Sequence, residues 1–340
     1  MKTLTVNLGE RSYDITIGQD LLKQAGEYFN LQRKILILTD SGVPKCYSKQ
    51  VLGCCTDGRI VTVGEGEASK SLSTLEQVLT EMMHFDMGRG DALVAVGGGV
   101  VGDLGGFAAA SYMRGIDFYQ VPTTVLSQVD SSIGGKCAVN LGGTKNIVGA
   151  FYQPKAVLID TNTLSTLSER LISAGLAEAV KMSLIADEEL FNIFEEQAID
   201  EEHMEELIVR SLLIKKKVVE EDEKENGLRK TLNFGHTLGH GIEAETEMKG
   251  LFHGECVALG MLPMCSDEVR NRLLTVMKKL NLPAHYDYDL DAALSYVIHD
   301  KKCSGGFVDM IYVEQVGRSE IRKMNVSDFQ SMVKERMLRK

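Results

Sequence analysis

Two histidines stand four residues apart in the stretch LNFGHTLGH. On a helix this spacing places His236 and His240 on one face, which Glu243 shares, and a third histidine, His253, opens the run HGECVALGM. Two imidazoles and a carboxylate with one open position are typical of a catalytic zinc site. The zinc-protease pattern needs a glutamate after the first histidine, where Thr237 stands. The sequence therefore predicts a metal site with a different chemistry and leaves open which three groups bind the ion.

Three glycines, Gly97, Gly99 and Gly102, have the GxGxxG spacing in ALVAVGGGVVGDLGGFAAAS. They follow an apolar run and precede an alanine-rich one, the context in which backbone N–H groups and a helix N-terminus approach a pyrophosphate. A tight strand-to-helix turn is the alternative. Asp40 closes the apolar run KILILTD, where it could accept hydrogen bonds from a ribose or cap a helix. Because this is not the first strand unit of the chain, the pattern indicates a variant of the common dinucleotide fingerprint.

Charged residues also fall on apolar helical faces. Glu178 and Lys181 lie on the stripe formed by Leu171, Ala174 and Ile185 and should point inward. An exposed pair at this spacing is the ordinary explanation and is worth only about 0.2–0.5 kcal/mol. On a buried face two charges cost several kcal/mol unless something compensates them, which favours a ligand or a metal.

The run EEHMEELIVRSLLIKKKVVEEDE contains three consecutive lysines, and periodicity separates them. Lys215 aligns with the apolar stripe, whereas Lys216 and Lys217 rotate away from it. A lysine stem that covers apolar surface while its head stays in water is an equally good explanation.

Short β-rich runs alternate with helical ones up to about residue 165, which predicts an open α/β sheet. Long stretches of 3.6-residue periodicity follow, with one weak strand pair in GFVDMIYVEQVGRSEIRKM. We therefore expect an α/β domain over 1–166 and a mostly helical domain over 167–340. The stretch SSIGGKCAVNLGGTKNIVGAFYQP looks too glycine-rich for regular structure, and we expect a long functional loop there.

Composition limits the classes of protein to consider. The 340 residues are 44% hydrophobic and carry a net charge of -11, which argues against general nucleic-acid binding. The N-terminus lacks the apolar core of a signal peptide, and no run approaches the roughly 20 apolar residues of a membrane span. The seven cysteines never show a CxxC spacing, so a reduced, cytoplasmic setting is expected.

Long motifs occur in order through nearly the whole chain: GEASKS, GGGVVGDLGGFAAASYMRG, VPTTVLSQVDSSIGGKCAVN, KNIVGAFYQP, GLAEAVK, RKTLNFGHTLGH, HGE and DKK. Together they resemble the 3-dehydroquinate synthase family of sugar-phosphate cyclases. The resemblance implies an α/β Rossmann-like NAD-binding domain followed by a mostly α-helical C-terminal domain that binds metal and substrate. It also implies a homodimer that converts DAHP to 3-dehydroquinate and phosphate, the second step of the shikimate pathway to chorismate.

The resemblance also assigns roles to single residues. Glu178, His236 and His253 match the ligands of zinc, which cobalt can replace. His240, one turn after His236, matches a residue that works on the substrate. The residues that match catalytic positions are Lys181, His240, Asn233 and Lys136.

Binding residues follow by the same resemblance. The positions matching NAD contacts are Asp40, Glu67, Lys70, Gly98, Gly99, Asp103, Thr123, Thr124, Lys145, Thr163, Leu164 and Thr166. The positions matching substrate contacts are Asp130, Lys136, Asn146, Lys215, Arg229, Asn233, His240 and one lysine of DKK, either Lys301 or Lys302. Arg114 matches a residue that reaches the substrate phosphate in the neighbouring subunit.

This chemistry suits the residues. A substrate with a carboxylate and a phosphate requires convergent cations, which explains buried lysines and arginines in an acidic protein. Zinc polarises the hydroxyl that NAD oxidises. Phosphate leaves by β-elimination, the hydride returns, and ring opening and an aldol step close the carbocycle. The family's proposal that the substrate phosphate removes the proton fits a site rich in cations, where Lys181 and His240 would stabilise developing oxyanions.

Two departures from the family pattern and three rival functions need testing. Gly42 stands where many relatives have a longer polar side chain, and Cys137 where threonine is frequent; we expect both to tune binding. One rival is another cyclase acting on a sugar phosphate without a carboxylate, such as a 2-deoxy-scyllo-inosose synthase. The others are a metal-dependent NAD polyol dehydrogenase and a non-catalytic binding module.

Overall fold

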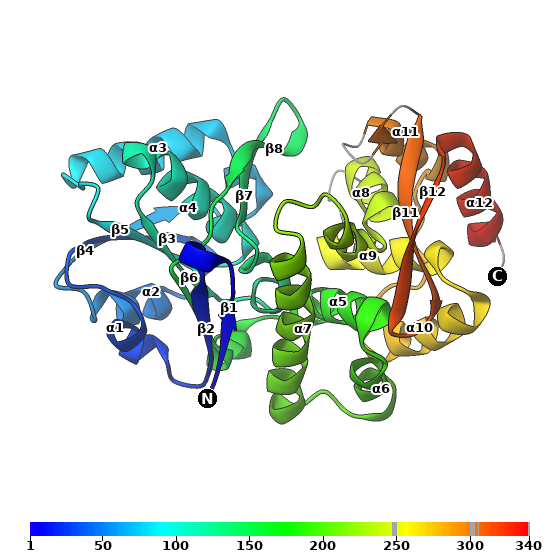
Figure 1. Cartoon of the computed structure of the whole chain (residues 1–340), viewed down its shortest axis with the longest axis horizontal. Coiled ribbons are helices and arrows are strands. Elements are labelled where there is room, and N and C mark those ends of the chain that lie inside the picture. The colour runs from blue at the N-terminus through cyan, green and yellow to red at the C-terminus, as the bar shows by residue number, and fades with distance from the viewer. Residues whose placement is uncertain (247–249, 300–302, 305, 339–340) are drawn as a thin grey trace. The chain divides into compact units, whose positions relative to one another are not determined.

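The computed structural model of the chain describes residues 1–246, 250–299, 303–304 and 306–338. These residues form two compact units, Met1–Leu167 and Ser168–Lys340 (Figure 1). Each unit has its own sheet and its own helices, and each is described by itself.

The first unit is built around a seven-stranded sheet with the order β1-β2-β9-β6-β5-β3-β4. All neighbouring strands run parallel except β1 and β2. The strands are β1 (Lys2–Val6), β2 (Tyr13–Gly18), β3 (Lys34–Asp40), β4 (Asp57–Val63), β5 (Ala92–Gly97), β6 (Asp117–Pro122) and β9 (Ala156–Asp160). The α-helices are α1 (Ala25–Tyr28), α2 (Lys45–Leu52), α3 (Leu72–His84) and α4 (Gly99–Ser111). Short helical turns are η1 (Gly9–Arg11), η2 (Leu22–Gln24), η3 (Glu67–Ser69), η4 (Tyr112–Arg114), the π-helical η5 (Ser127–Ser131) and η6 (Thr161–Thr166).

Strand β3 explains why this sheet is covered on both faces. Leu36 and Leu38 pack in a cluster with side chains of α3 and α4, whereas Ile35 and Ile37 pack with side chains of α1 and α2. Figure 1 shows these helices on opposite faces of the sheet. Successive side chains of a strand point to opposite faces of the sheet. A run such as KILIL, in which apolar residues do not alternate with polar ones, must therefore be covered on both faces. Each such buried side chain contributes about 1.5–3 kcal/mol.

The glycine-rich stretch expected to be a loop contains a hairpin instead, so the prediction of irregular structure was wrong. Strands β7 (Lys136–Leu141) and β8 (Thr144–Phe151) pair antiparallel. Gly142 and Gly143, with φ of +59° and +79°, form the two-residue turn between them. Two central residues with positive φ give the tight turn whose twist suits a hairpin. The glycines therefore serve the turn instead of marking irregular backbone.

The second unit is mostly helical. Its α-helices are α5 (Glu169–Ala186), α6 (Glu188–Glu196), α7 (Glu201–Glu221), α8 (His236–Glu245), α9 (His253–Met261), α10 (Asp267–Lys279), α11 (Leu290–His299) and α12 (Val326–Leu338). Two 3₁₀ helices are η7 (Leu228–Asn233) and η8 (Leu262–Met264). A small antiparallel sheet contains β10 (Cys303–Ser304), β11 (Phe307–Gln315) and β12 (Arg318–Asn325). The weak strand pair predicted from the sequence is thus confirmed as β11 and β12.

Local capping explains where these helices begin. Ser168, Asp187, Asp200 and Ser266 each precede a helix and accept a hydrogen bond from a backbone N–H in its first turn. Such N-caps satisfy donors that the helix itself leaves without partners, and each is worth about 1 kcal/mol.

Helix α5 carries the charges that the sequence placed on an inward face. Glu178 and Lys181 are 0% and 1% exposed, so that prediction is confirmed. Leu171 is 39% exposed and does not belong to the buried stripe, because it lies in the first turn of the helix. The overall fold class, an α/β domain followed by a mostly helical one, is also confirmed. Among the described residues, no helix combines the length and apolarity needed to cross a membrane.

Candidate active site

Three histidines of the second unit gather around one point. His236 is the first residue of α8, His240 lies one turn later, and His253 is the first residue of α9. Their ring centroids are 5.3 to 5.8 Å apart, and one ring nitrogen of each lies within 4.8 Å of the others. The predicted cluster is therefore confirmed as a group of side chains that could hold a metal ion.

The side chain of Glu178, on α5, points toward these histidines. Its Oε1 lies 3.5 Å from His236 Nε2 and 3.4 Å from His253 Nε2. Lys181 Nζ lies 2.6 Å from Oε2 and compensates that oxygen as a close ion pair. Oε1 accepts no well-aligned hydrogen bond from the described residues, and a buried carboxylate oxygen in that state is costly unless something binds it.

The donor set fits a divalent metal. Tetrahedral ligands that lie about 2.0–2.1 Å from zinc are about 3.3–3.4 Å from one another, which is close to both separations from Glu178 to the imidazoles. A metal would also satisfy the carboxylate oxygen that has no hydrogen bond. His240 belongs to the same histidine group, so the geometry by itself does not exclude it as a ligand.

The other ring nitrogens of two histidines are held by acceptors. His236 Nδ1 lies 3.1 Å from the carbonyl oxygen of Phe234, and His253 Nδ1 lies 3.5 Å from Glu243 Oε1. An acceptor at Nδ1 favours the tautomer with its proton there, which leaves Nε2 free to bind a metal. Glu243, which the sequence placed on the same helical face, therefore lies where it can orient His253. No sequence motif pointed to the Phe234 carbonyl as a partner of His236.

Charges control the protonation of this cluster. Burial opposes ionisation of Glu178, but Lys181 and His253 outweigh it and hold the pKa of the carboxyl below its usual range. Burial likewise opposes the charged form of His253, but Glu178 and Glu243 raise its pKa above the usual range. A positive charge is thus favoured at this point, and either a proton or a metal can provide it.

The predicted substrate residues of this unit lie on α7 and on the turn η7. Lys215 is 6% exposed, whereas Lys217 is exposed and Lys216 pairs with Glu220 at 2.9 Å. The prediction that Lys215 alone turns inward is confirmed. It lies on α7, which packs against both α5 and η7.

Arg229 and Asn233 are both held in place by the chain segment before η7. Arg229 is 1% exposed and donates to the carbonyl of Glu223. Asn233 Nδ2 donates to Glu225 Oε1 at 2.7 Å. A buried guanidinium held in one orientation is well suited to bind a carboxylate or phosphate. Lys301 and Lys302, the two candidates in DKK, lie outside the described residues.

In the first unit the predicted cofactor residues collect at the carboxyl ends of the parallel strands. Strands β3 and β5 are neighbours, but the chain leaves β3 toward β4 on one side and leaves β5 toward β6 on the other. Such a switch point is where open α/β sheets bind ligands. The predicted residues that follow β3, β5, β6 and β9 at this edge are Asp40, Gly98, Gly99, Thr123, Thr124, Thr163, Leu164 and Thr166.

Helix α4 begins at this edge without a side-chain cap. Its N-cap residue is Gly98, and no side chain in the described part of the chain accepts a hydrogen bond from its first turn. A Cβ on Gly98 would lie 3.2 Å from Thr124, and one on Gly99 would lie 3.1 Å from Ser131. The glycines therefore keep the backbone N–H groups open to an anion such as a pyrophosphate.

The Asp40 side chain stabilises the turn that directly follows it. Its Oδ1 accepts hydrogen bonds from the backbone N–H groups of Gly42 and Val43, at 2.8 and 3.1 Å. Helix α2 begins at Lys45 with Pro44 as its N-cap, so Asp40 is not a helix cap. Burial raises the pKa of Asp40 above its usual value, although the two backbone donors oppose the shift.

Three further cofactor candidates form a linked group. Lys70 is 5% exposed and its Nζ lies 2.5 Å from Asp103 Oδ2. Asn140 of β7 donates to Glu67 Oε1 at 2.8 Å and accepts from the backbone N–H of Asn146 at 2.9 Å. Asn140 connects the cofactor candidates to the hairpin, and sequence reasoning missed it because the stretch around it was taken for an irregular loop.

The remaining candidates of this unit lie on the hairpin and on two unusual turns. Lys136 and Asn146 are exposed, Lys145 is half-buried, and Asp130 lies in the π-helical turn η5. Arg114 has a φ of +69°. For a residue other than glycine such a backbone costs about 1–3 kcal/mol and is often found at functional sites.

The two departures noted in the sequence have different surroundings. Cys137 is 3% exposed and packs against Gly106, because alternation along β7 turns it away from the face of Lys136. Any effect of Cys137 on binding would therefore act through the packing of β7, and that expectation stays a prediction. A Cβ on Gly42 would lie 2.6 Å from Glu65 Oε2, so glycine leaves room for that carboxylate.

Comparison with known proteins places these residues in context. A family model for the 3-dehydroquinate synthase N-terminal region matches residues 60–174, and one for the C-terminal region matches residues 175–303. A 3-dehydroquinate synthase of Clostridium beijerinckii is 41% identical over 97% of this chain and 100% of its own length.

Solved structures are similar to this chain over nearly its whole length. A 2-deoxy-scyllo-inosose synthase complexed with carbaglucose-6-phosphate, NAD+ and Co2+ has a TM-score of 0.88 at 27% identity, covering 98% of this chain and 100% of its own. A 2-epi-5-epi-valiolone synthase from Streptomyces hygroscopicus with NAD+ and Zn2+ bound also has a TM-score of 0.88, at 26% identity, covering 98% of this chain and 97% of its own.

Proposed function

Because this chain belongs to the 3-dehydroquinate synthase family, we propose that it converts DAHP, 3-deoxy-D-arabino-heptulosonate 7-phosphate, to 3-dehydroquinate and phosphate. It is then a carbon–oxygen lyase of the shikimate pathway. The observation that carries the proposal is the fully buried Glu178 carboxylate, which pairs with Lys181 through one oxygen and faces two imidazole nitrogens with the other.

We propose that Glu178, His236 and His253 hold the metal, which is zinc or cobalt. When bound, the metal supplies a Lewis acid that favours loss of the proton from a substrate hydroxyl. Lys181, fully buried beside Glu178, adds a fixed positive charge. His240, on the same helix as His236, is placed to hold the substrate oxygen and to stabilise its negative charge.

Lys215, Arg229 and Asn233 bind the anionic ends of the substrate in this proposal. Two of them are buried cations, and a buried cation is compensated when an anion binds it. Lys136, Asp130, Asn146 and Lys301 or Lys302 complete the proposed substrate contacts. The base that takes the substrate proton is proposed to be the substrate's own phosphate, because the carboxylates of the metal cluster are already engaged with cations.

The first unit binds NAD in this proposal. The open N-terminus of α4 receives the pyrophosphate, and Asp40 accepts hydrogen bonds from a ribose. When bound, NAD would supply reversible hydride transfer, so that it is regenerated within each turnover. Glu67, Lys70, Asp103, Lys145 and the threonines after β6 and β9 are the further cofactor contacts. The proposed domains are therefore 1–166 for NAD and 167–340 for metal and substrate.

We further propose a homodimer in which Arg114 reaches the neighbouring active site. Support comes from exposed apolar side chains beside Arg114 and along the hairpin: Met113, Leu141, Ile147 and Phe151 are each more than 40% exposed. A hydrogen bond from Tyr152 Oη to the carbonyl of Ile116 joins the turn to the base of the hairpin. Exposed apolar groups of this kind are typical of an interface. A cytoplasmic location is proposed because six of the seven cysteines, Cys46, Cys54, Cys55, Cys137, Cys256 and Cys265, are free.

The test is to mix the purified protein with DAHP, NAD and zinc and to follow phosphate and NADH absorbance together. We expect phosphate in proportion to DAHP consumed and no net NADH, because the hydride returns. Steady accumulation of NADH would assign the protein to the dehydrogenases. Phosphate or cyclised product from glucose 6-phosphate or sedoheptulose 7-phosphate, but not from DAHP, would assign it to another cyclase.

A further inference from the structure

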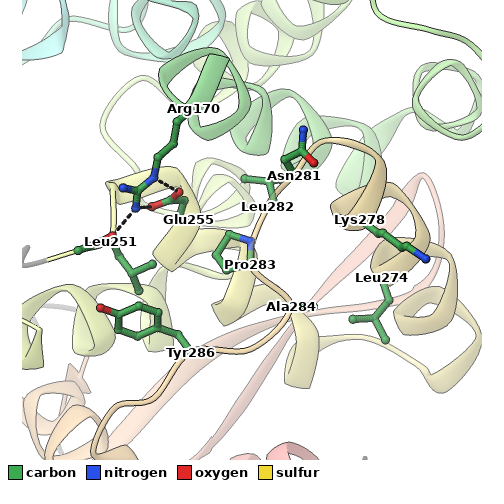
Figure 2. A pocket seen from close by; sticks show the side chains of 11 residues that line it. Arg170, Leu251, Glu255, Leu274, Lys278, Asn281, Leu282, Pro283, Ala284 and Tyr286 are labelled. Atoms are coloured by element: carbon green, nitrogen blue, oxygen red, sulfur yellow. Dashed lines mark hydrogen bonds and ion pairs between the residues drawn. The ribbon is translucent and has the colours of Figure 1, made fainter. Parts of the chain in front are cut away.

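An arginine outside the proposed metal cluster holds the helix that carries one of its histidines. Arg170 Nε and Nη2 each lie 2.7 Å from an oxygen of the Glu255 carboxylate, a two-point contact between α5 and α9. The carboxylate is 5% exposed, whereas the arginine side chain is 52% exposed. Figure 2 shows the guanidinium turned toward Glu255. Both residues line a cavity of about 630 Å³.

The same guanidinium contacts the chain just before α9. It donates to the carbonyl of Gly250 and lies over the ring of Phe252, 4.7 Å from the centroid. Glu255 in turn accepts a hydrogen bond from the backbone N–H of Phe252 at 2.7 Å, which caps the helix that begins at His253. Arg170 and Glu255 thus fix the direction in which the chain enters α9.

Helices α5 and α9 also touch through their backbones at this place. A Cβ on Gly254 would overlap the carbonyl oxygen of Ala174, so only glycine allows the observed approach. Arg170, Ala174 and Glu178 are spaced by four residues and lie along one side of α5. Opposite them, His253, Gly254 and Glu255 are consecutive in the first turn of α9.

We propose that Arg170 is a positioning residue of the metal centre, which sets the separation between Glu178 and His253 by holding the first turn of α9 against α5. Without the arginine, the buried Glu255 would have to bind a proton or turn toward water in the adjoining cavity. The first turn of α9 would move with it, and so would the imidazole. The inference rests on the metal binding of the proposed function, but not on the identity of the substrate.

The experiment compares Arg170→Met with Arg272→Met in the full chain. Arg272 is a matched control because it makes the same two-point contact, to Glu195 at 3.0 and 2.7 Å, and lies over the ring of Phe191. That pair joins α10 to α6 and contains none of the proposed metal ligands. Metal-free protein is titrated with Co2+, and the affinity is obtained from the visible absorption spectrum and from competition with a chelator.

We expect Arg170→Met to weaken Co2+ binding by about 10- to 100-fold and to alter the visible spectrum, as loss of groups that orient metal ligands does. Arg170→Lys, which restores the charge but not the two-point contact, should recover part of the affinity. Arg272→Met should lower the melting temperature of the metal-free protein without changing Co2+ affinity. These values do not depend on turnover, so an enzyme inactive with DAHP would still test the inference.

Several results would overturn it. Unchanged Co2+ affinity and spectrum in Arg170→Met would reduce the arginine to a structural role. An equal loss of affinity in Arg272→Met would attribute the effect to general destabilisation. If Arg170→Met does not fold, the Arg170→Lys variant decides, and wild-type affinity in that variant would contradict the proposal. Absence of Co2+ binding by the wild-type protein would do so as well.

Discussion

The two units hold their proposed ligand groups in opposite ways. In Met1–Leu167 many of them lie at the carboxyl ends of parallel strands, where the N-terminus of α4 offers glycine backbone. In Ser168–Lys340 they are charged side chains on helices, and Glu178, Lys181 and Arg229 are at most 1% exposed. A charge buried among helices needs a partner, whereas a loop at a sheet edge does not. Function and stability are therefore coupled in the second unit and largely separable in the first.

The largest effect is expected from Glu178→Gln. Loss of a metal ligand removes several kcal/mol of transition-state stabilisation, so kcat/KM should fall by roughly a thousandfold or more. Lys181 would also keep its buried charge without a carboxylate, at a cost of about 3–5 kcal/mol in unfolding free energy. Steady-state kinetics, bound-metal analysis and chemical denaturation measure these quantities.

Asp103→Asn makes the same carboxylate-to-amide change in the first unit and is compared with Glu178→Gln. Asp103→Asn removes the carboxylate beside Lys70, but that aspartate is 19% exposed, so solvent can replace it. We expect a smaller loss of stability and unchanged metal content. Equal losses in the two variants would contradict the distinction between the units.

His240→Ala separates metal binding from catalysis within the second unit. If His240 acts on the substrate, turnover should fall by about 100-fold, in the range of general acid–base groups, while metal content stays at the wild-type level. Phosphate release and metal analysis on the same preparation check this. Loss of the metal would instead make His240 a ligand, and full turnover would remove its proposed role.

Lys215→Met and Lys216→Met compare neighbouring lysines. Lys215 is buried and proposed to bind the substrate, so its loss should raise the KM for DAHP by about tenfold, the effect of a charged hydrogen bond worth roughly 1.5 kcal/mol. Lys216 is partly exposed and paired with Glu220, so its loss should change stability by less than about 0.5 kcal/mol and leave KM unchanged. Equal changes in KM would contradict the assignment.

Metal affinity should rise with pH. The pKa of His253 is raised to about 10, because Glu178 and Glu243 outweigh the opposing effect of burial, so a metal must displace its proton at neutral pH. One displaced proton makes affinity rise about tenfold per pH unit below that value. The metal-free protein should show the opposite trend: the stabilisation from charged His253 is complete below about pH 6.5 and is lost as pH rises toward 10. Co2+ titrations and melting curves at several pH values test both signs, and a flat affinity profile would contradict the protonated state.

The smallest effect is expected from Gly99→Ala. The new Cβ would lie 3.1 Å from Ser131 Oγ, so the turn must shift by a few tenths of an ångström. We expect NAD affinity to fall about fivefold, or roughly 1 kcal/mol, with Co2+ affinity unchanged. Fluorescence titration with NAD and the Co2+ titration provide the two values. A loss of Co2+ affinity would show that the two units do not separate these functions.

Some features followed from the sequence because they depend on local periodicity. The four-residue spacing of His236 and His240 and the apolar positions around Glu178, Lys181 and Lys215 determine which side of a helix each residue occupies. The same holds for the parallel strands, whose unbroken apolar runs require cover on both faces. The glycine content of residues 131–154 does not determine their structure, since a glycine pair can form a tight hairpin turn as readily as an irregular loop.

Only the tertiary structure decided which distant residues meet. No spacing in the chain predicts that Glu243 contacts His253 or that Asn140 hydrogen-bonds to both Glu67 and Asn146. The same holds for the contact between Arg170 and Glu255, which are 85 residues apart. These contacts depend on how whole helices and strands pack, and packing is fixed by the summed burial of many side chains. The sequence by itself determined the helical faces and the chemical types of the site residues; the tertiary structure decided the distances between them.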